Sequence, residues 1–232
     1  MEMDKGYIKN STPSISFPSL ISEMLELDDS VWKEWIFYHL LDFFQKYDRE
    51  NLNNTIEKAK QNPKLKVENE IAKFIRNTLR KNKQFEIQGF LVKGGINNDL
   101  DKEGIYDISF LHSFWWKNKD GEKAEFHFEC KNLNENSKSN LIGRYVNNGV
   151  CRFFNGQYAQ NQDFGGMIGF VLEGNHLTIK AKIHKKLDAT PEINLIKIDD
   201  NSIQENDFTF DSYHWRSNLK FVIHHLLFDI SA

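Results

Sequence analysis

The sequence has few of the features that mark membrane, secreted or fibrous proteins. Only two of its 232 residues are cysteines, Cys130 and Cys151, and they form no CxxC pair. This argues against a disulfide framework and a structural zinc site, and favours a reducing, cytoplasmic compartment. No apolar run reaches the roughly 18 to 20 residues of a membrane span, and no apolar segment follows Met1 to form a secretory signal. We therefore expect a cytoplasmic protein without a membrane partner.

The sequence also has no excess of positive charge. It carries 30 basic and 33 acidic residues, for a net charge of −3. Binding to nucleic acid would therefore depend on a local basic surface and not on the field of the whole molecule. Hydrophobic residues make up 40% and charged residues 27% of the chain. This balance excludes collagen-like and disordered classes and predicts a globular chain that buries a core.

Composition divides the chain into three regions. The prolines and serines of residues 1–20 predict an extended arm. Residues 20–62 are expected to form a helical N-terminal extension, in which Asp28 and its polar neighbours are a helix start signal. Residues 66–232 are expected to form one α/β domain.

The extension carries a thick aromatic stripe. Trp32, Trp35 and Phe43 recur at spacings that place them on one side of a helix. The simpler interpretation is a helical cap that packs on the core. The alternative is an interaction module that engages a partner through these three side chains, because large aromatic residues anchor interfaces.

Periodicity predicts the order of elements in the α/β domain. Apolar spacing and turn signals indicate a helix at 66–82, strands at 85–92, 105–116 and 123–131, a helix at 138–155 and a buried strand at 167–173. A glycine- and aspartate-rich loop covers residues 93–103. A basic amphipathic stretch at 178–186 and a closing apolar segment at 219–230 follow.

The strand expected at 123–131 separates two kinds of side chain. Alternate residues of a strand point to opposite faces. One face is apolar, and the other carries Glu129 and Lys131 side by side. In an antiparallel hairpin whose turn is centred on residue 118, Asp107 lies opposite Glu129, and the turn signal at 118–121 is within two residues of that centre. Two carboxylates and a lysine are therefore expected at one end of the hairpin.

Two carboxylates this close repel each other unless a proton or a divalent cation lies between them. Ligation by oxygen alone selects Mg²⁺ or Mn²⁺ over zinc. The backbone carbonyl of Cys130 supplies a further oxygen next to Asp107 and Glu129. Such a metal polarises a phosphoryl oxygen and lowers the pKa of bound water, while Lys131 orients that water or stabilises charge on the phosphate.

Asp107, followed after 21 intervening residues by Glu129-Cys130-Lys131, resembles the motif of the PD-(D/E)xK nuclease superfamily. Tyr106 stands where the motif has proline. The resemblance implies a restriction-endonuclease-like core of α-β-β-β-α-β order, with a mixed central sheet flanked by helices. It also implies a metal-dependent endonuclease that acts in restriction, phage defence or repair. The match covers the core from residue 66 to about 173, under half of the chain.

The family often carries a glutamate on the helix before the first strand. Glu68 begins a stretch, ENEIAKFI, that resembles the pattern of the resolvase-like members. At about 100° per residue, Glu68 falls within the apolar arc of the helix, whereas Glu70 lies off its edge. An acid on an inward face needs a partner, so Glu68 is expected to support the metal or its waters.

Arg144 and Arg152 lie eight residues apart in the helix expected after Lys131. On one face of a continuous helix, they could follow a phosphate backbone or form surface ion pairs. We expect a nucleic-acid substrate, with DNA favoured over RNA, and a homodimer or a subunit of a larger complex that adds contacts to it. The alternative is a catalytically silent nuclease-fold subunit that binds nucleic acid or protein. A solvated hairpin, with Glu129 and Lys131 in a weak surface ion pair, is the simplest reading of the motif.

Overall fold

The computed structural model describes residues 29–94, 107–112, 125–136, 138–155, 157–159, 162–200 and 207–231. The expected arm at 1–20, the turn at 118–121 and Tyr106 lie outside these residues. The helices are α2 (Asp29–Lys46), α3 (Arg49–Gln61), α4 (Val67–Leu79), α5 (Lys83–Ile87), α6 (Leu141–Asn147) and α7 (His176–Asp188), with 3-10 helices η1 (Val150–Phe153) and η2 (Pro191–Ile193). The strands are β1 (Phe90–Lys93), β2 (Ile108–His112), β3 (Glu125–Asn134), β4 (Phe164–Glu173), β5 (Leu195–Asp199), β6 (Thr209–Arg216) and β7 (Leu219–Asp229).

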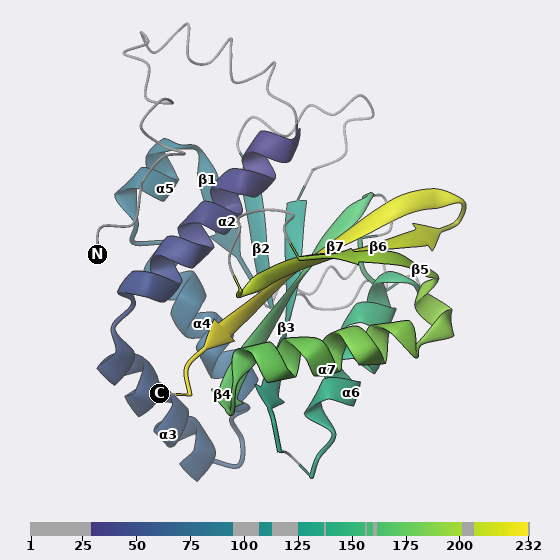
Figure 1. The fold of residues 1–232 in the computed structure, drawn as a ribbon. Coiled ribbons are helices and arrows are strands. Elements are labelled where there is room, and N and C mark those ends of the chain that lie inside the picture. Colours follow the sequence, from purple (N-terminus) through teal and green to yellow (C-terminus); the bar gives the residue numbers. More distant parts are fainter. Residues whose placement is uncertain are drawn as a thin grey trace, which may run out of the picture.

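The described strands form one mixed sheet of seven strands in the order β1-β2-β3-β4-β7-β6-β5 (Figure 1). β3 pairs with β4 in parallel, and so does β4 with β7. The outer pairs on both sides are antiparallel. The chain is thus an α/β protein in which N-terminal helices precede a mixed sheet, as expected from the sequence.

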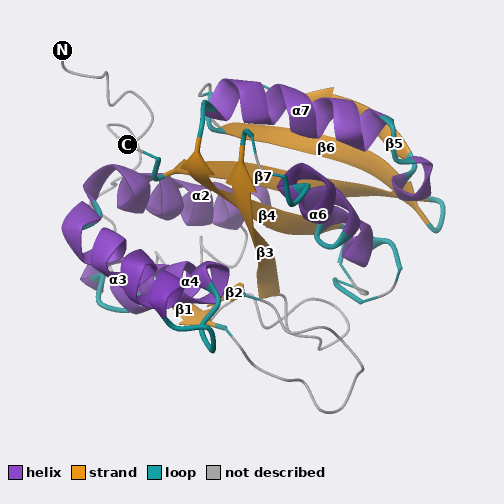
Figure 2. Cartoon of the chain, turned by 90° about the horizontal axis from the view of Figure 1, so that it is seen from below, coloured by secondary structure: helices purple, strands orange, loops and turns teal. Residues whose placement is uncertain are grey.

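Helices cover both faces of this sheet and bury two hydrophobic cores (Figure 2). α2, α3, α4 and α5 supply the helical side of the first core, and α6, η1 and α7 supply that of the second. In β3, Phe126 and Phe128 enter the first core, so the alternation predicted from the sequence is present. β4 lies between the two cores and needs a residue without a side chain where it meets β3. A Cβ at Gly166 would collide with the Phe128 ring.

The described part of the N-terminal extension packs directly on the sheet. The ring of Phe37 in α2 has no exposed surface and contacts the rings of Phe126 and Phe128. Phe43 is also buried, and Trp35 packs partly buried against Phe90. The aromatic stripe is therefore used mainly inside the molecule, which favours the helical cap over a free docking surface. The side chain of Trp32 lies outside the described residues.

The strand predicted at 85–92 is wrong in its first half. Residues Lys83–Ile87 form the short helix α5, and only Phe90–Lys93 are extended, as β1. The Asn82 side chain caps the helix by accepting the N–H of Gln84. Gly89, at φ 81°, then turns the chain into the strand. Phe85 and Ile87 alternate with polar residues, which is the pattern of a strand. In the short helix, however, only Phe85 is buried.

The single helix predicted at 138–155 is also wrong, since the chain forms α6 and then η1. The break lies at Gly149, where a Cβ would collide with the Tyr145 carbonyl oxygen and the Met167 side chain. Arg144 and Arg152 therefore lie on separate helices and not on one continuous face. Elsewhere, α4 and β4 occupy the segments in which a helix and a buried strand were expected. The basic amphipathic stretch forms α7, and the closing apolar segment forms β7.

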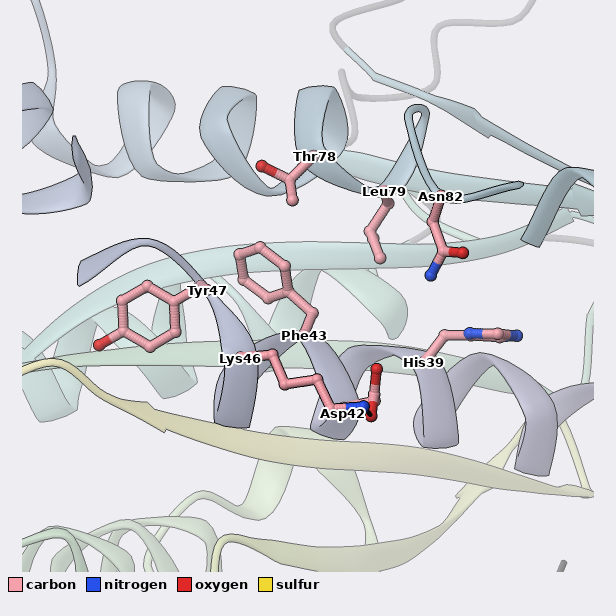
Figure 3. Close-up of a pocket in the computed structure, with 8 residues that line it drawn as sticks. All are labelled: His39, Asp42, Phe43, Lys46, Tyr47, Thr78, Leu79 and Asn82. Atoms are coloured by element: carbon pink, nitrogen blue, oxygen red, sulfur yellow. Dashed lines mark ion pairs between the residues drawn. The ribbon is translucent and has the colours of Figure 1, made fainter. Parts of the chain in front are cut away.

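A small cavity of about 130 Å³ lies between α2 and the end of α4 (Figure 3). Its lining residues are His39, Asp42, Phe43, Lys46, Tyr47, Thr78, Leu79 and Asn82. None of the carboxylates expected to act in catalysis contributes to this cavity. Among the described helices, none is long and apolar enough to cross a lipid bilayer.

Candidate active site

The register of β2 and β3 brings Asp107 to Glu129. Ile108 pairs with Phe128, and Ser109 pairs with His127. Continued by one residue, the same register sets Asp107 opposite Glu129, as predicted from the sequence. Asp107 lies just before β2, and its Oδ2 accepts a hydrogen bond of 2.7 Å from the backbone N–H of Cys130.

β3 continues past its last partner in β2 and leaves an open edge, which consists of residues 129–132. On one edge of a strand, every second N–H points the same way. The N–H groups of Cys130 and Asn132 therefore need acceptors that β2 does not supply. Asp107 accepts the first, and Glu68 Oε2 accepts the second at 3.1 Å. Glu68 reaches this edge from the first turn of α4, the helix on which it was predicted.

The ammonium of Lys131 lies among three oxygens at this open edge. It donates to the Cys130 carbonyl oxygen at 2.8 Å and to Glu68 Oε1 at 3.4 Å. It also donates to Glu129 Oε1 in a very close ion pair. Only 12% of the Lys131 side chain and 3% of the Glu129 side chain are exposed. This burial excludes the weak surface ion pair as an account of the motif.

Arg152 and Tyr158 hold Glu129 from the other side. Arg152 Nη1 lies 3.2 Å from Glu129 Oε1 and 2.7 Å from the Tyr158 hydroxyl oxygen. The Tyr158 hydroxyl is also hydrogen-bonded to Glu129. Arg152 is thus engaged by Glu129, whereas Arg144 is exposed on α6 and makes no side-chain contact with these carboxylates in the described part of the chain.

Tyr158 and Arg76 are two further members of the site, and for neither did the sequence predict the contact that it makes there. Arg76 Nη1 donates to the backbone carbonyl of Asp107, which ties the start of β2 to α4. Its position two helical turns after Glu68 was the available signal. Tyr158 belongs to a stretch next to the expected helix, but no spacing rule linked its hydroxyl to Glu129.

Burial makes the two carboxylates hard to ionise, and repulsion by Glu129 adds to this effect at Asp107. Burial, followed by the nearby charge of Glu129, raises the pKa of Asp107 to about 7. Burial also raises the pKa of Glu129, although Lys131 and Arg152 oppose the shift. For Lys131, burial lowers the pKa, but the carboxylates of Glu129 and Glu68 outweigh it and the net shift is upward. The edge therefore has an affinity for positive charge that Lys131 satisfies.

The side chains do not form a ready cage for a metal. Within the described ranges, no three His, Cys, Asp or Glu side chains gather closely enough to hold an ion. The donor atoms nevertheless suit a hard divalent cation. They are all oxygens, from Asp107, Glu129, Glu68 and the Cys130 carbonyl, and a cation already sits among three of them. The set fits Mg²⁺ or Mn²⁺ if the ammonium moves away.

The raised pKa of Asp107 predicts that this residue lowers stability at neutral pH. Its pKa is about 7 in the folded protein and near 3.8 when unperturbed. A raised folded-state pKa contributes stability that is complete below about pH 4 and is lost as the pH rises through 7. In EDTA, Asp107→Asn should raise the free energy of unfolding by about 4 kcal/mol at pH 8, and the difference should vanish near pH 4. Urea unfolding at both pH values measures this, and an equal or lower stability of the variant at pH 8 would contradict it.

Two backbone N–H groups, one carbonyl, three carboxylates and three side-chain donors thus meet at the open edge of β3. The elements that bring them there are far apart in the sequence: the first turn of α4, the start of β2, β3 and the segment around η1. Comparisons with protein-family models, with curated proteins and with solved structures found nothing that matches this chain.

Proposed function

We propose that this chain is a metal-dependent nuclease of restriction-endonuclease-like fold that hydrolyses phosphodiester bonds, with DNA as the favoured substrate. The observation that carries the proposal is the meeting of Asp107, Glu129, Lys131 and the Cys130 carbonyl at the open edge of β3. The order α4, β1, β2, β3, α6, β4 supports the fold, since it matches the expected α-β-β-β-α-β core with α5 added.

In the proposed site, Asp107, Glu129 and the Cys130 carbonyl hold the metal, and Glu68 holds the metal or its waters. When bound, Mg²⁺ or Mn²⁺ supplies a Lewis acid that lowers the pKa of a coordinated water. Lys131 orients the attacking water or stabilises the charge that develops on the phosphate.

Arg152 and Tyr158 fix the position of Glu129, because both bond to its carboxylate. A carboxylate that is held from two sides loses little conformational freedom when it binds the metal, so the site is preorganised. Arg144, exposed on the neighbouring α6, is free of these contacts and is assigned to the phosphate backbone of the substrate. With a net charge of −3, the chain is proposed to act as a homodimer or within a complex that adds contacts to nucleic acid.

A second candidate is a catalytically silent subunit of the same fold that binds nucleic acid or protein. One observation favours it: the carboxylates of Asp107, Glu68 and Glu129 each have a hydrogen-bond or ion-pair partner within the chain. The raised pKa of Asp107 opposes it, because a purely structural edge gains nothing from a carboxylate that resists ionisation.

The two candidates differ in a cleavage assay. Supercoiled plasmid, single-stranded DNA and RNA are each incubated with the protein in Mg²⁺, in Mn²⁺ or in EDTA, and the products are separated on gels. We expect nicked and linear plasmid to accumulate with either metal and not with EDTA. Cleavage of RNA alone would correct the substrate. Intact nucleic acid of all three kinds would favour the silent subunit.

A further inference from the structure

Lys131 occupies the position in which three oxygens converge, two from β3 and one from α4. The oxygens belong to the Cys130 carbonyl at 2.8 Å, the Glu68 carboxylate at 3.4 Å and the Glu129 carboxylate in closer contact. An ammonium has three N–H donors, so each oxygen takes one. The side chain is almost fully buried, and the ammonium is therefore part of the folded site and not a mobile surface charge.

These three oxygens are also metal donors in the function proposed above. A divalent cation competes with the ammonium for these oxygens, because the two positive charges repel each other at such short range. We propose that Lys131 is a built-in competitor of the metal: its ammonium fills the cation position of the free protein, and metal binds only as the ammonium leaves. The inference rests on the proposed function and adds to it the regulation of metal affinity.

The ion pairs of Glu129 also stabilise the folded protein. Burying Glu129 without a nearby cation would leave a charge out of water without compensation, which is strongly destabilising. Lys131 and Arg152 both form ion pairs with Glu129 Oε1 and compensate its buried charge. Part of this stabilisation, the ion pair between Lys131 and Glu129, is lost when the metal binds. Metal affinity is consequently lower than the oxygen donors alone would produce.

Titration of Mn²⁺ into variants, followed by calorimetry without nucleic acid, tests the competition. Lys131→Met removes the ammonium and keeps a side chain of similar length, so we expect it to bind Mn²⁺ at least roughly tenfold more tightly than the unchanged protein. Lys131→Arg keeps the charge and should stay within about threefold of the unchanged protein. Lys73→Met is the matched control, because Lys73 is an exposed lysine of α4 that pairs with Glu70.

The outcomes separate this inference from the proposed function. If the unchanged protein binds Mn²⁺ but Lys131→Met binds it equally or less tightly, the competition is wrong and the nuclease proposal stands. If neither protein binds Mn²⁺, both are wrong. Binding by Lys131→Met alone supports the competition most directly.

A measurement on the unchanged protein avoids any question of whether a variant folds. Reductive methylation labels lysines according to their accessibility, and mass spectrometry reads each position. We expect Mn²⁺ to increase the labelling rate of Lys131 severalfold, because the ammonium is driven out of the carboxylates, while the rate at Lys73 is unchanged. An unchanged or slower rate at Lys131 at saturating Mn²⁺ would overturn the competition.

Discussion

Asp107→Asn should lower the rate of metal-dependent plasmid cleavage by at least about 10³-fold. The amide removes the negative charge opposite Glu129 and with it one charged oxygen ligand of the proposed metal. Its carbonyl oxygen can still accept the N–H of Cys130, so the start of β2 keeps its attachment to β3. The loss should therefore be a loss of chemistry and not of folding. Initial rates of plasmid nicking in Mg²⁺ and in Mn²⁺ measure the effect.

Glu70→Gln is the matched control for this experiment. Glu70 lies two residues from Glu68 on α4 but pairs with Lys73 at the surface, so the variant should cut at the rate of the unchanged protein. A nuclease activity that survives in Asp107→Asn would place the catalytic site elsewhere. Together with the expected gain in stability at pH 8, the loss of activity would mark Asp107 as a residue retained at a cost to folding.

Phe37→Ala should lower the free energy of unfolding by about 3 to 5 kcal/mol. The Phe37 ring is fully buried between α2 and β3, where it contacts the rings of Phe126 and Phe128 and the imidazole of His224. Its removal leaves a cavity next to the strand that carries Glu129. Urea unfolding followed by circular dichroism gives the difference, with one cooperative transition expected for both proteins.

Tyr38→Ala is the comparison for Phe37→Ala, since Tyr38 is the next residue of α2 and is 37% exposed. We expect it to cost less than about 1 kcal/mol. A small effect of both substitutions would show that α2 contributes little to the core. The aromatic stripe would then become a candidate for partner binding again.

Several parts of the site could be predicted because they depend on local periodicity and simple register. The alternation of β3 separates Phe126 and Phe128 from Glu129 whatever the rest of the chain does. Antiparallel pairing then relates Asp107 to Glu129 by number alone, and the pairing of Ile108 with Phe128 confirms it. The helical period likewise placed Glu68, and not Glu70, on the apolar face of its helix.

Other parts depend on contacts between distant segments. The first half of the strand expected at 85–92 is the helix α5, because Asn82 caps it and Phe85 packs into the core. Gly149 ends α6 because β4 approaches it through Met167. The separation of the two arginines follows from that break.

Local sequence was thus sufficient for the elements whose side chains repeat with a clear period, and for the face of each that is buried, since these follow from backbone geometry over a few residues. Contacts between distant segments determined which polar groups lie together. Lys131 lies among the oxygens of Glu68, Glu129 and Cys130, with Tyr158 bonded to Glu129, because the parallel pairing of β3 with β4 and the packing of α4 enclose one strand edge that β2 leaves open. Satisfying that edge and the charge buried beside it is a property of the assembled fold.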